Sequence, residues 1–194
     1  RFAATLRPYQ RRGFAWLEAA TSEGFGPLLA DDMGLGKTIQ ALALLQSRAL
    51  DQVDPSDSRE PAISLVVAPP STLENWRHES LKLAPALTPI IYHGATRAER
   101  LDDAAAGRAG GAPLLITSYQ TLLKDVERLS QLEWDHLIFD EIQQIKNLRT
   151  KSYRAARTLT ARRRLALSGT PVENSSLELY AVVDLLNPGF LGSR

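Results

Sequence analysis

The fold is decided by the stretch Leu29-Ala30-Asp31-Asp32-Met33-Gly34-Leu35-Gly36-Lys37-Thr38. A short apolar run, residues 27–30, leads into a turn with two glycines, and Lys37 and Thr38 begin an amphipathic helical pattern that extends to residue 50. Glycine at these positions lets backbone N–H groups point inward at phosphate oxygens, and a helix N-terminus adds its dipole. The pattern therefore predicts a loop that grips the phosphates of a nucleoside triphosphate.

Two side chains in this loop have expected roles. Lys37 would reach the β- and γ-phosphates, and the Thr38 hydroxyl would bind Mg²⁺. One position departs from the general G-x-x-x-x-G-K-[ST] pattern, because Asp31 stands where the pattern has glycine. Taken alone, the loop leaves a chance match open.

Length and composition limit the class of protein. A chain of 194 residues with 44% hydrophobic and 23% charged residues suits one globular domain. Its net charge of +1 means that any nucleic-acid contact must come from a local basic face. The chain has no cysteine, which excludes a disulfide framework and zinc–thiolate sites. No apolar run is long enough to span a bilayer, so we expect a soluble intracellular protein with no membrane partner.

Short apolar runs alternate with helical patterns along the chain. Continuously apolar strands such as residues 63–68 are expected where both faces of a sheet are covered. The alternation predicts an α/β fold with three layers, in which helices cover both faces of a mainly parallel sheet. We expect strands at 27–30, 63–68, 88–92, 113–117, 136–139 and 164–167, and helices at 8–20, 37–50, 71–84, 97–106, 118–129, 151–159 and 175–186.

Two stretches have the composition of loops. Residues 51–61 are rich in Asp, Ser and Pro, and residues 104–113 are rich in Ala and Gly. The first is predicted to be a flexible loop. Neither marks a domain boundary, because the alternation of strands and helices resumes after each, and we expect residues 1–194 to form one domain.

An acidic pair follows one predicted strand directly. Asp140 and Glu141 come after the apolar run 136–139. In a nucleoside triphosphatase, Asp140 would hold Mg²⁺, and Glu141 would orient or deprotonate the attacking water. Gln143 could relay between the γ-phosphate and another segment. A solvated acidic turn is the alternative, and the phosphate loop upstream favours the catalytic interpretation.

A turn of small residues follows the last predicted strand. Ser168, Gly169 and Thr170 come directly after residues 164–167. Their hydroxyl groups could bond the acidic pair on a neighbouring strand and report the nucleotide state. Taken alone, the segment fits a tight turn that uses glycine and proline for its geometry.

Together these segments resemble the Swi/Snf-type DNA-dependent ATPases of helicase superfamily two, and in particular their first RecA-like lobe. The resemblance covers nearly the whole chain, and the family commonly has an acidic residue where this chain has Asp31. Gln143 is a form associated with bacterial members, whereas Ile142 has no firm interpretation. The matching segments are residues 6–10 with Gly13 and 16–17, 30–38, 66–71 with Leu73, Asn75 and Trp76, 92–94, 116–119, 140–143 with 145–147, 167–171 with 173–174, and 185–188.

The resemblance implies ATP and Mg²⁺ as ligands. Gln10 would hydrogen-bond adenine, Lys37 with Asp140 and Glu141 would form the catalytic set, and Thr38 with Asp140 would hold the metal. Coupling would fall to Gln143, Ser168, Gly169 and Thr170. The residues expected to bind ATP are Arg7, Gln10, Asp32, Met33, Gly34, Leu35, Gly36, Lys37 and Thr38.

The resemblance also implies partners. Double-stranded DNA would be held through its backbone phosphates, without base identity, at the starts of the helices predicted at 71–84 and 118–129. The residues expected to touch DNA are Pro70, Ser71, Thr117, Ser118, Tyr119 and Lys146. A second RecA-like lobe of the same protein would supply arginine fingers, so the chain alone is expected to bind ATP weakly, hydrolyse it negligibly and not translocate. We expect a bacterial cytoplasmic, nucleoid-associated protein, or a nuclear one if the source is eukaryotic.

Three other functions are weighed against this one. A nucleotide-gated module that recruits another protein could lose Lys37 or Glu141, and both are kept. A small-molecule kinase has no place for the segments after the acidic pair, and an RNA helicase fits Ile142 and Gln143 poorly. Among residues without an assigned function, Trp16, Trp76 and Trp134 are expected in the core, and residues 162–164 in a solvated turn before a strand.

Overall fold

The sheet has six strands in the order β1-β6-β5-β2-β4-β3, and every pairing of neighbours is parallel. The structure is a computed structural model, and it describes residues 2–51, 62–170 and 176–192. The expected mainly parallel sheet is thus confirmed, and it is parallel throughout the described chain. The strands are β1 (Leu28–Leu29), β2 (Ser64–Ala68), β3 (Leu87–Ile91), β4 (Ala112–Ser118), β5 (Glu133–Asp140) and β6 (Thr160–Leu167).

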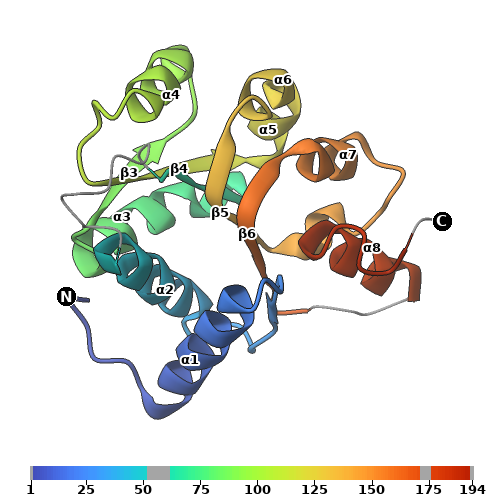
Figure 1. Ribbon diagram of the computed structural model, residues 1–194, viewed down its shortest axis with the longest axis horizontal. Helices are drawn as coiled ribbons and strands as arrows, with labels where there is room; N and C mark the ends of the chain where they lie inside the picture. Colours follow the sequence, from blue (N-terminus) through green and yellow to red (C-terminus); the bar gives the residue numbers. More distant parts are fainter. Residues whose placement is uncertain (1, 52–61, 171–175, 193–194) are drawn as a thin grey trace.

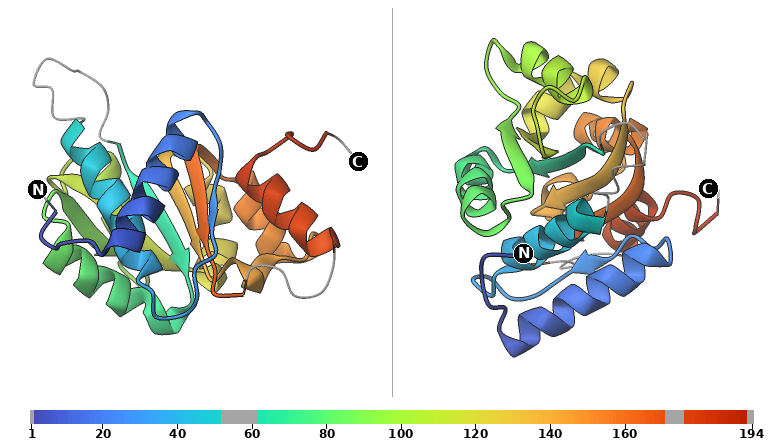
Figure 2. Two further views of the ribbon diagram at one scale, coloured as in Figure 1. Left: turned by 90° about the horizontal axis from the view of Figure 1, so that it is seen from below. Right: turned by 60° about the vertical axis from the view of Figure 1, so that its left-hand side comes forward.

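Helices cover both faces of this sheet, as Figure 1 shows. The first three α-helices lie on one face and the other five on the opposite face, and Figure 2 shows the same layers from two further directions. The α-helices are α1 (Pro8–Ser22), α2 (Lys37–Asp51), α3 (Leu73–Leu83), α4 (Arg97–Ala105), α5 (Tyr119–Lys124), α6 (Val126–Leu129), α7 (Lys151–Thr158) and α8 (Ser176–Leu186), with 3-10 turns η1 (Pro70–Thr72) and η2 (Ile142–Ile145).

The core is split into two clusters by the sheet, one on each face. Strand β2 is buried on both sides, so Leu65 and Val67 belong to one cluster while Val66 and Ala68 belong to the other. This alternation with a period of two is the pattern of a central strand, whose side chains point to opposite faces in turn. It explains why the apolar run around β2 is continuous.

The predicted helix at 118–129 is wrong in one respect, because two helices occupy this stretch. The chain leaves helical geometry at Asp125, which has a φ of −115° and a ψ of 21° between α5 and α6. The Asp125 carboxylate accepts hydrogen bonds from Arg97 and from the Tyr92 hydroxyl. These two contacts hold the Asp125 side chain at the break between α5 and α6. Tyr92 comes from the loop after β3 and Arg97 from α4.

Element ends differ from the predicted ones elsewhere. The helix expected at 71–84 starts as the 3-10 turn η1, and β5 and β6 begin three and four residues earlier than expected, at Glu133 and Thr160. The early part of β6 alternates between exposed and partly buried residues, which hides it from a search for apolar runs. In the stretch 104–113 only the middle is loop, because α4 extends to residue 105 and β4 begins at residue 112. Residue 51 belongs to α2, and the rest of the predicted loop 51–61 lies outside the described residues.

Two expectations about single residues are corrected. Trp16 keeps 48% of its surface exposed, whereas Trp76 and Trp134 are fully buried as expected. Residues 162–164 lie within β6, and Arg164 is buried and donates to the carbonyls of Leu159 and Leu185. Burial lowers the pKa of Arg164 to about 10. The guanidinium of Arg164 therefore has a structural role, because it links β6 to the carbonyls of Leu159 and Leu185.

One margin of the sheet is formed by β3, which pairs only with β4. The Tyr92 N–H, just after the strand, donates to the Ile116 carbonyl of β4. Because backbone groups alternate in direction along a strand, those of Leu87, Pro89 and Ile91 point away from β4.

In the residues that the structure describes, no helix is both long and apolar enough to cross a membrane.

Candidate functional site

All the predicted site segments except the one that begins α1 follow the carboxyl end of a strand. Since the strands are parallel, these ends share one edge of the sheet, which is where ligands bind in open α/β sheets. The order of strands divides this edge into two halves. The loops after β1, β6 and β5 form one half, called here the phosphate half. The loops after β2, β4 and β3 form the other, called here the outer half.

The loop after β1 has the geometry of an anion-binding turn. Gly34 and Gly36 have φ angles of 82° and 75°, in the left-handed region that glycine adopts without strain. The next residue, Lys37, starts α2, so the loop ends at a helix N-terminus. The Lys37 ammonium donates to the carbonyls of Asp31 and Asp32, at 2.7 and 3.1 Å. Lysine is thus folded over the loop, with its charge satisfied by the loop's own backbone.

The segment before α1 is bonded to the same loop. The Gln10 amide donates to the Leu35 carbonyl at 3.2 Å, and its oxygen accepts from the Arg7 N–H at 2.9 Å. The Tyr9 hydroxyl also donates to the Leu35 carbonyl, at 3.2 Å. A side chain at position 36 would put its Cβ 2.6 Å from Gln10 Nε2, so only glycine fits there. Gln10 therefore lies directly against the phosphate loop, and Tyr9 is a contact that the sequence did not indicate.

Asp31, the departure from the general phosphate-loop pattern, has a partner of its own. The Gln40 amide on α2 donates to its carboxylate at 2.9 Å. Gln40 is fully buried, and a Cβ at Gly13 on α1 would lie 1.8 Å from the Gln40 oxygen. Asp31 is therefore fixed to the first turns of α2, and Gly13 leaves the space for its partner. No sequence signal marked Gln40, because the resemblance accounted for an acidic residue at position 31 without indicating its partner.

Asp140, the last residue of β5, is held on both carboxylate oxygens. Its Oδ2 accepts from the indole N–H of Trp76 at 2.8 Å, and its Oδ1 accepts from the Glu141 N–H at 3.0 Å. Burial raises the pKa of Asp140, the Trp76 N–H opposes the rise, and the charge of Glu141 adds to it. The Lys37 ammonium is close enough to lower this pKa, which places the acidic pair beside the phosphate loop.

Glu141 has an unusual backbone. Its φ of 49° and ψ of 53° put it in the left-handed region, and it is the only residue other than glycine with a positive φ in the described chain. Such a conformation carries strain of about 1–3 kcal/mol and is concentrated at functional sites. The carboxylate accepts a hydrogen bond from the Gln143 amide in η2. The backbone and this amide together fix where the carboxylate points.

The turn after β6 reaches the acidic pair through Gln143. The Ser168 hydroxyl donates to the Gln143 oxygen at 2.8 Å and accepts from the Thr170 N–H at 3.1 Å. A Cβ at Gly169 would lie 2.8 Å from the Met33 side chain and 3.8 Å from the Lys37 ammonium, so the turn also touches the phosphate loop. The sequence suggested a direct bond to the acidic pair. In the structure Gln143 stands between them.

The outer half presents one exposed segment and one buried segment. Pro70 and Ser71 are exposed at the start of η1. Where β4 ends and α5 begins, Thr117, Ser118 and Tyr119 are all buried. Their side-chain hydroxyl groups are therefore turned away from solvent in this structure.

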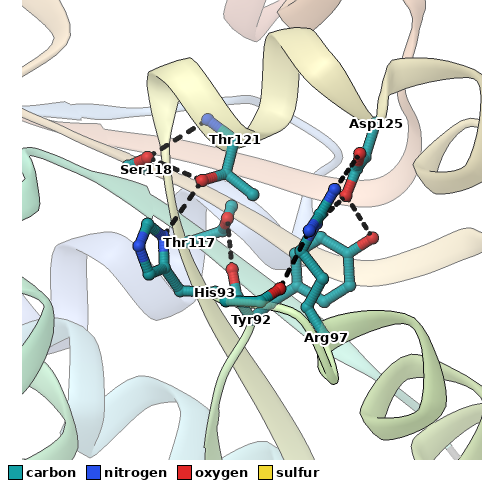
Figure 3. A network of polar contacts seen from close by, with 8 residues as sticks. Tyr92, His93, Arg97, Thr117, Ser118, Thr121 and Asp125 are labelled. Carbon is teal, nitrogen blue, oxygen red and sulfur yellow. Dashed lines mark hydrogen bonds and ion pairs between the residues drawn. The ribbon is translucent and has the colours of Figure 1, made fainter.

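Figure 3 shows how the buried hydroxyl groups are engaged. The Thr117 hydroxyl donates to the Tyr92 carbonyl at 3.0 Å, and the Ser118 hydroxyl caps α5 by accepting from the Thr121 N–H at 3.1 Å. His93, which is exposed, contacts the Thr121 hydroxyl at 3.3 Å. His93 is consequently the solvent-facing polar group next to this network.

Lys146 follows β5 and so belongs to the phosphate half of the edge. It follows η2, and its ammonium pairs with the Glu178 carboxylate on α8 at 2.9 Å. The pair reduces the net charge that Lys146 offers to a phosphate. Arg149 and Lys151, which are exposed a few residues further on, were not singled out from the sequence.

The fold and the loop at the head of α2 define a P-loop α/β domain of the RecA-like type. The chain belongs to the SNF2-related domain family, whose sequence pattern matches residues 9–194. The resemblance to Swi/Snf-type ATPases is thereby confirmed.

Two similar proteins support this family assignment. The chain is 43% identical over 192 residues to the putative ATP-dependent helicase/translocase YwqA of Bacillus subtilis, covering 99% of this chain and 20% of that protein. It is 36% identical to the TATA-binding protein-associated factor MOT1 of Saccharomyces cerevisiae, covering 98% of this chain and 10% of that protein. The chain thus spans a fifth or less of these two proteins.

Solved structures agree in the fold. The Sulfolobus solfataricus SWI2/SNF2 ATPase core in complex with dsDNA superposes with a TM-score of 0.83 at 41% identity, over 99% of this chain and 38% of that one. The Sulfolobus solfataricus SWI2/SNF2 ATPase core domain gives a TM-score of 0.80 at 40% identity, over 99% of this chain and 37% of that one.

Proposed function

We propose that this chain is the ATP-binding first lobe, residues 1–194, of a DNA-dependent ATPase that couples ATP hydrolysis to movement along double-stranded DNA. The observation that carries the proposal is the meeting of three segments at one edge of the sheet. The charge of Lys37 lowers the pKa of Asp140, Gln143 bonds both Glu141 and Ser168, and a Cβ built at Gly169 would lie 2.8 Å from Met33 of the phosphate loop. The family relationship supports the same reading.

ATP would bind in the phosphate half. The N–H groups around Gly34 and Gly36 and the start of α2 suit the phosphates, together with the exposed loop residues Asp32, Met33 and Leu35. Lys37 would leave its two backbone carbonyls and turn to the β- and γ-phosphates. Gln10, with Arg7 next to it, would present its amide to the adenine while it holds the loop.

Mg²⁺ fits the residues that are present. Thr38 lies at the first turn of α2 and Asp140 at the end of β5, which supplies one hydroxyl and one buried carboxylate. Both donors are oxygens, and Mg²⁺ is usually held by one or two protein oxygens together with phosphates and waters. When bound, the ion would neutralise charge on the phosphates. The protein's own part is to hold Asp140 still, through Trp76 and the Glu141 N–H.

Hydrolysis requires a placed base. The carboxylate of Glu141 would accept the proton of the attacking water or orient it, and the Gln143 amide holds that carboxylate in place. Through Gln143, Ser168 and Thr170 would sense the occupied state of the site. We infer that these residues couple nucleotide state to movement of the lobe.

Double-stranded DNA would lie across the outer half. The exposed Pro70 and Ser71 offer a polar helix start to a backbone phosphate, and contact to phosphates alone carries no base identity. Thr117, Ser118 and Tyr119 would contribute through the shape of their turn, because their hydroxyl groups are engaged inside. Lys146 would contribute only if its pair with Glu178 opens.

A second RecA-like lobe would complete the enzyme. Arginine fingers contribute roughly 10³–10⁵-fold in related phosphoryl-transfer systems, and we assign them to that lobe. The similarity to a Bacillus subtilis protein supports a bacterial source, in which the enzyme would work in the cytoplasm on the nucleoid.

The test is ATP hydrolysis by the chain extended through its second lobe. The assay is run without nucleic acid and with double-stranded DNA, single-stranded DNA or RNA, with Glu141→Gln as the control. We expect stimulation mainly by double-stranded DNA, abolished by the substitution. Equal stimulation by RNA, or none by any nucleic acid, would overturn the proposal.

A further inference from the structure

Two aromatic side chains connect the outer half to the acidic pair. The Trp76 indole N–H on α3 donates to Asp140 Oδ2 at 2.8 Å, and the Tyr119 hydroxyl at the start of α5 donates to the Asp140 backbone carbonyl at 2.7 Å. Tyr119 directly follows Ser118, and Trp76 comes shortly after Ser71. The helices that follow β2 and β4, α3 and α5, thus each send one donor to the same residue on β5.

Neither bond can be exchanged for water. Trp76 is fully buried, Tyr119 is 4% exposed and Asp140 is 7% exposed. If Asp140 moved away, a buried N–H and a buried O–H would be left without acceptors, which is strongly unfavourable. Asp140 and the two donors therefore move together.

Tyr119 acts on the peptide group between Asp140 and Glu141. The carbonyl that it binds belongs to that peptide group, and the N–H of the same group donates to Asp140 Oδ1 at 3.0 Å. The following residue has the left-handed φ of 49°. The orientation of this one peptide plane decides the direction of the Glu141 side chain, and Tyr119 holds it from one side.

The path from the surface to Asp140 is short and stiff. Trp76 lies on the first turn of α3, which follows the exposed η1 directly. The Ser118 hydroxyl caps the start of α5, and this cap fixes Tyr119 relative to the end of β4. A displacement at Ser71 or Ser118 consequently reaches Asp140 through one helical turn and one hydrogen bond.

We propose that Trp76 and Tyr119 are positioning residues, through which duplex DNA held at the outer half sets the placement of Asp140 and Glu141. The proposal rests on the function proposed above and adds the route of coupling. Both residues act through Asp140 and contribute no atom to the reaction.

The test uses the two-lobe protein with Trp76→Phe and Tyr119→Phe. Each change removes one donor and keeps an aromatic ring in the same place. The chain offers matched controls, because Trp134 donates to the Leu129 carbonyl at 3.1 Å and Tyr153 donates to the Asp184 carboxylate at 2.7 Å. Trp134→Phe and Tyr153→Phe thus remove the same kinds of donor from bonds that do not involve Asp140.

The readout is a coupling factor measured by equilibrium binding. The dissociation constant of a non-hydrolysable ATP analogue with Mg²⁺ is measured with and without saturating duplex, and that of the duplex with and without the analogue. The two ratios must agree, and couplings of this kind are commonly about 5–150-fold. We expect both variants to lower the factor about fivefold or to unity, and the double variant to do no more than the stronger single one, because both act on one residue.

The outcomes separate the two proposals. Unchanged coupling in both variants, or an equal loss in the Trp134→Phe and Tyr153→Phe controls, would overturn the positioning role while the DNA-dependent function stands. A parent protein that binds no duplex, or whose two ligands do not influence one another, would overturn both, and this result is seen before any variant is made.

Discussion

Glu141 is the residue whose backbone departs furthest from ordinary geometry. With a φ of 49°, any side chain at this position pays the steric penalty of the left-handed region, about 1–2 kcal/mol. We therefore expect Glu141→Gly to be more stable than Glu141→Ala by about 1 kcal/mol, the reverse of the usual ranking within helices and strands. Both variants lose the bond to Gln143, so the comparison isolates the backbone.

Urea denaturation of the two variants side by side gives this difference. Both should lack ATP hydrolysis in the two-lobe protein, because both lack the carboxylate. An alanine variant as stable as the glycine variant would show that the left-handed conformation relaxes at no cost.

Gly36 is fixed by a neighbour as well as by its backbone. Gly36→Ala would force a Cβ to within 2.6 Å of Gln10 Nε2 at a φ of 75°, so it should displace Gln10 from the phosphate loop. We expect nucleotide affinity to fall by about tenfold or more, since 1.4 kcal/mol of strain in the bound form already corresponds to tenfold. The measurement is titration with a fluorescent ATP analogue.

Gly24→Ala is the control for this prediction. Gly24 has a φ of 83° but has no atom within 4 Å of a Cβ built there, and it lies in the turn after α1. It should lower stability by a similar backbone penalty and leave nucleotide affinity unchanged. Equal losses of affinity in the two variants would contradict the specific role of the contact with Gln10.

At the scale of single residues, the sequence was informative where chemistry is written in a local pattern. The placement of Lys37 at a helix start and of Asp140 at a strand end followed from the residues next to them in the sequence. The bond between Trp76 and Asp140 joins residues 64 positions apart, and no periodicity reports such a pair. Trp76 was correctly expected in the core, but the direction of its N–H depends on how α3 lies on the sheet.

Among the elements, the break between α5 and α6 depends on one carboxylate. The Arg97 guanidinium that donates to Asp125 holds the pKa of that carboxyl below its usual value. A carboxyl with a lowered pKa in the folded state stabilises the fold at pH values above its unfolded pKa, and this contribution is lost as the pH falls through the folded value. Asp125→Asn should therefore lower the unfolding free energy at neutral pH.

The difference between parent and Asp125→Asn should shrink in acid, as the pH falls through the lowered pKa of the parent carboxyl and the carboxyl becomes neutral. In Asp125→Asn an amide N–H₂ replaces one carboxylate oxygen and turns a donor toward the donors of Arg97. The remaining amide oxygen therefore does not restore the unfolding free energy lost at neutral pH. Urea unfolding at neutral and acidic pH gives both values. A difference that stayed constant with pH would assign the effect to packing.

The elements were predicted well where they are buried along their whole length and less well where they are not. Strand β2 was found within one residue, because all five of its residues are buried. The start of β6 was missed, because its first four residues alternate between exposed and partly buried and its three consecutive arginines resemble a solvated turn. Arg164 becomes part of the core only because the carbonyls of Leu159 and Leu185 happen to meet it, which is a property of the tertiary structure.

For the molecule as a whole, the separation of binding and hydrolysis can be measured. Residues 1–194 alone should bind a nucleotide analogue with reduced affinity and hydrolyse ATP at least about 10³-fold more slowly than the two-lobe protein, because the arginine finger is assigned to the second lobe. Isothermal titration and phosphate release give the two quantities. Hydrolysis by this chain near the rate of the two-lobe protein would show that the first lobe holds a complete catalytic set.

The class of fold was predictable from the sequence because the alternation of strands and helices leaves few arrangements for a chain of this size. The order of strands was not, and with it the division of the sheet edge into a phosphate half and an outer half. That division requires β5 and β2 to be neighbours, although their ends at the site, Ala68 and Asp140, lie 72 positions apart in the sequence.

The outward side of β3 has a consequence for how copies of the molecule behave toward one another. An open strand edge can pair with a strand of a second copy and begin aggregation. Here the Leu87 N–H is already given to the Ala84 carbonyl, Pro89 has no N–H, and the Ile91 carbonyl accepts from Arg100. Each outward residue of the strand thus has one backbone group that is occupied or absent, so this margin is a poorer template for pairing with a second copy than a fully open strand edge would be.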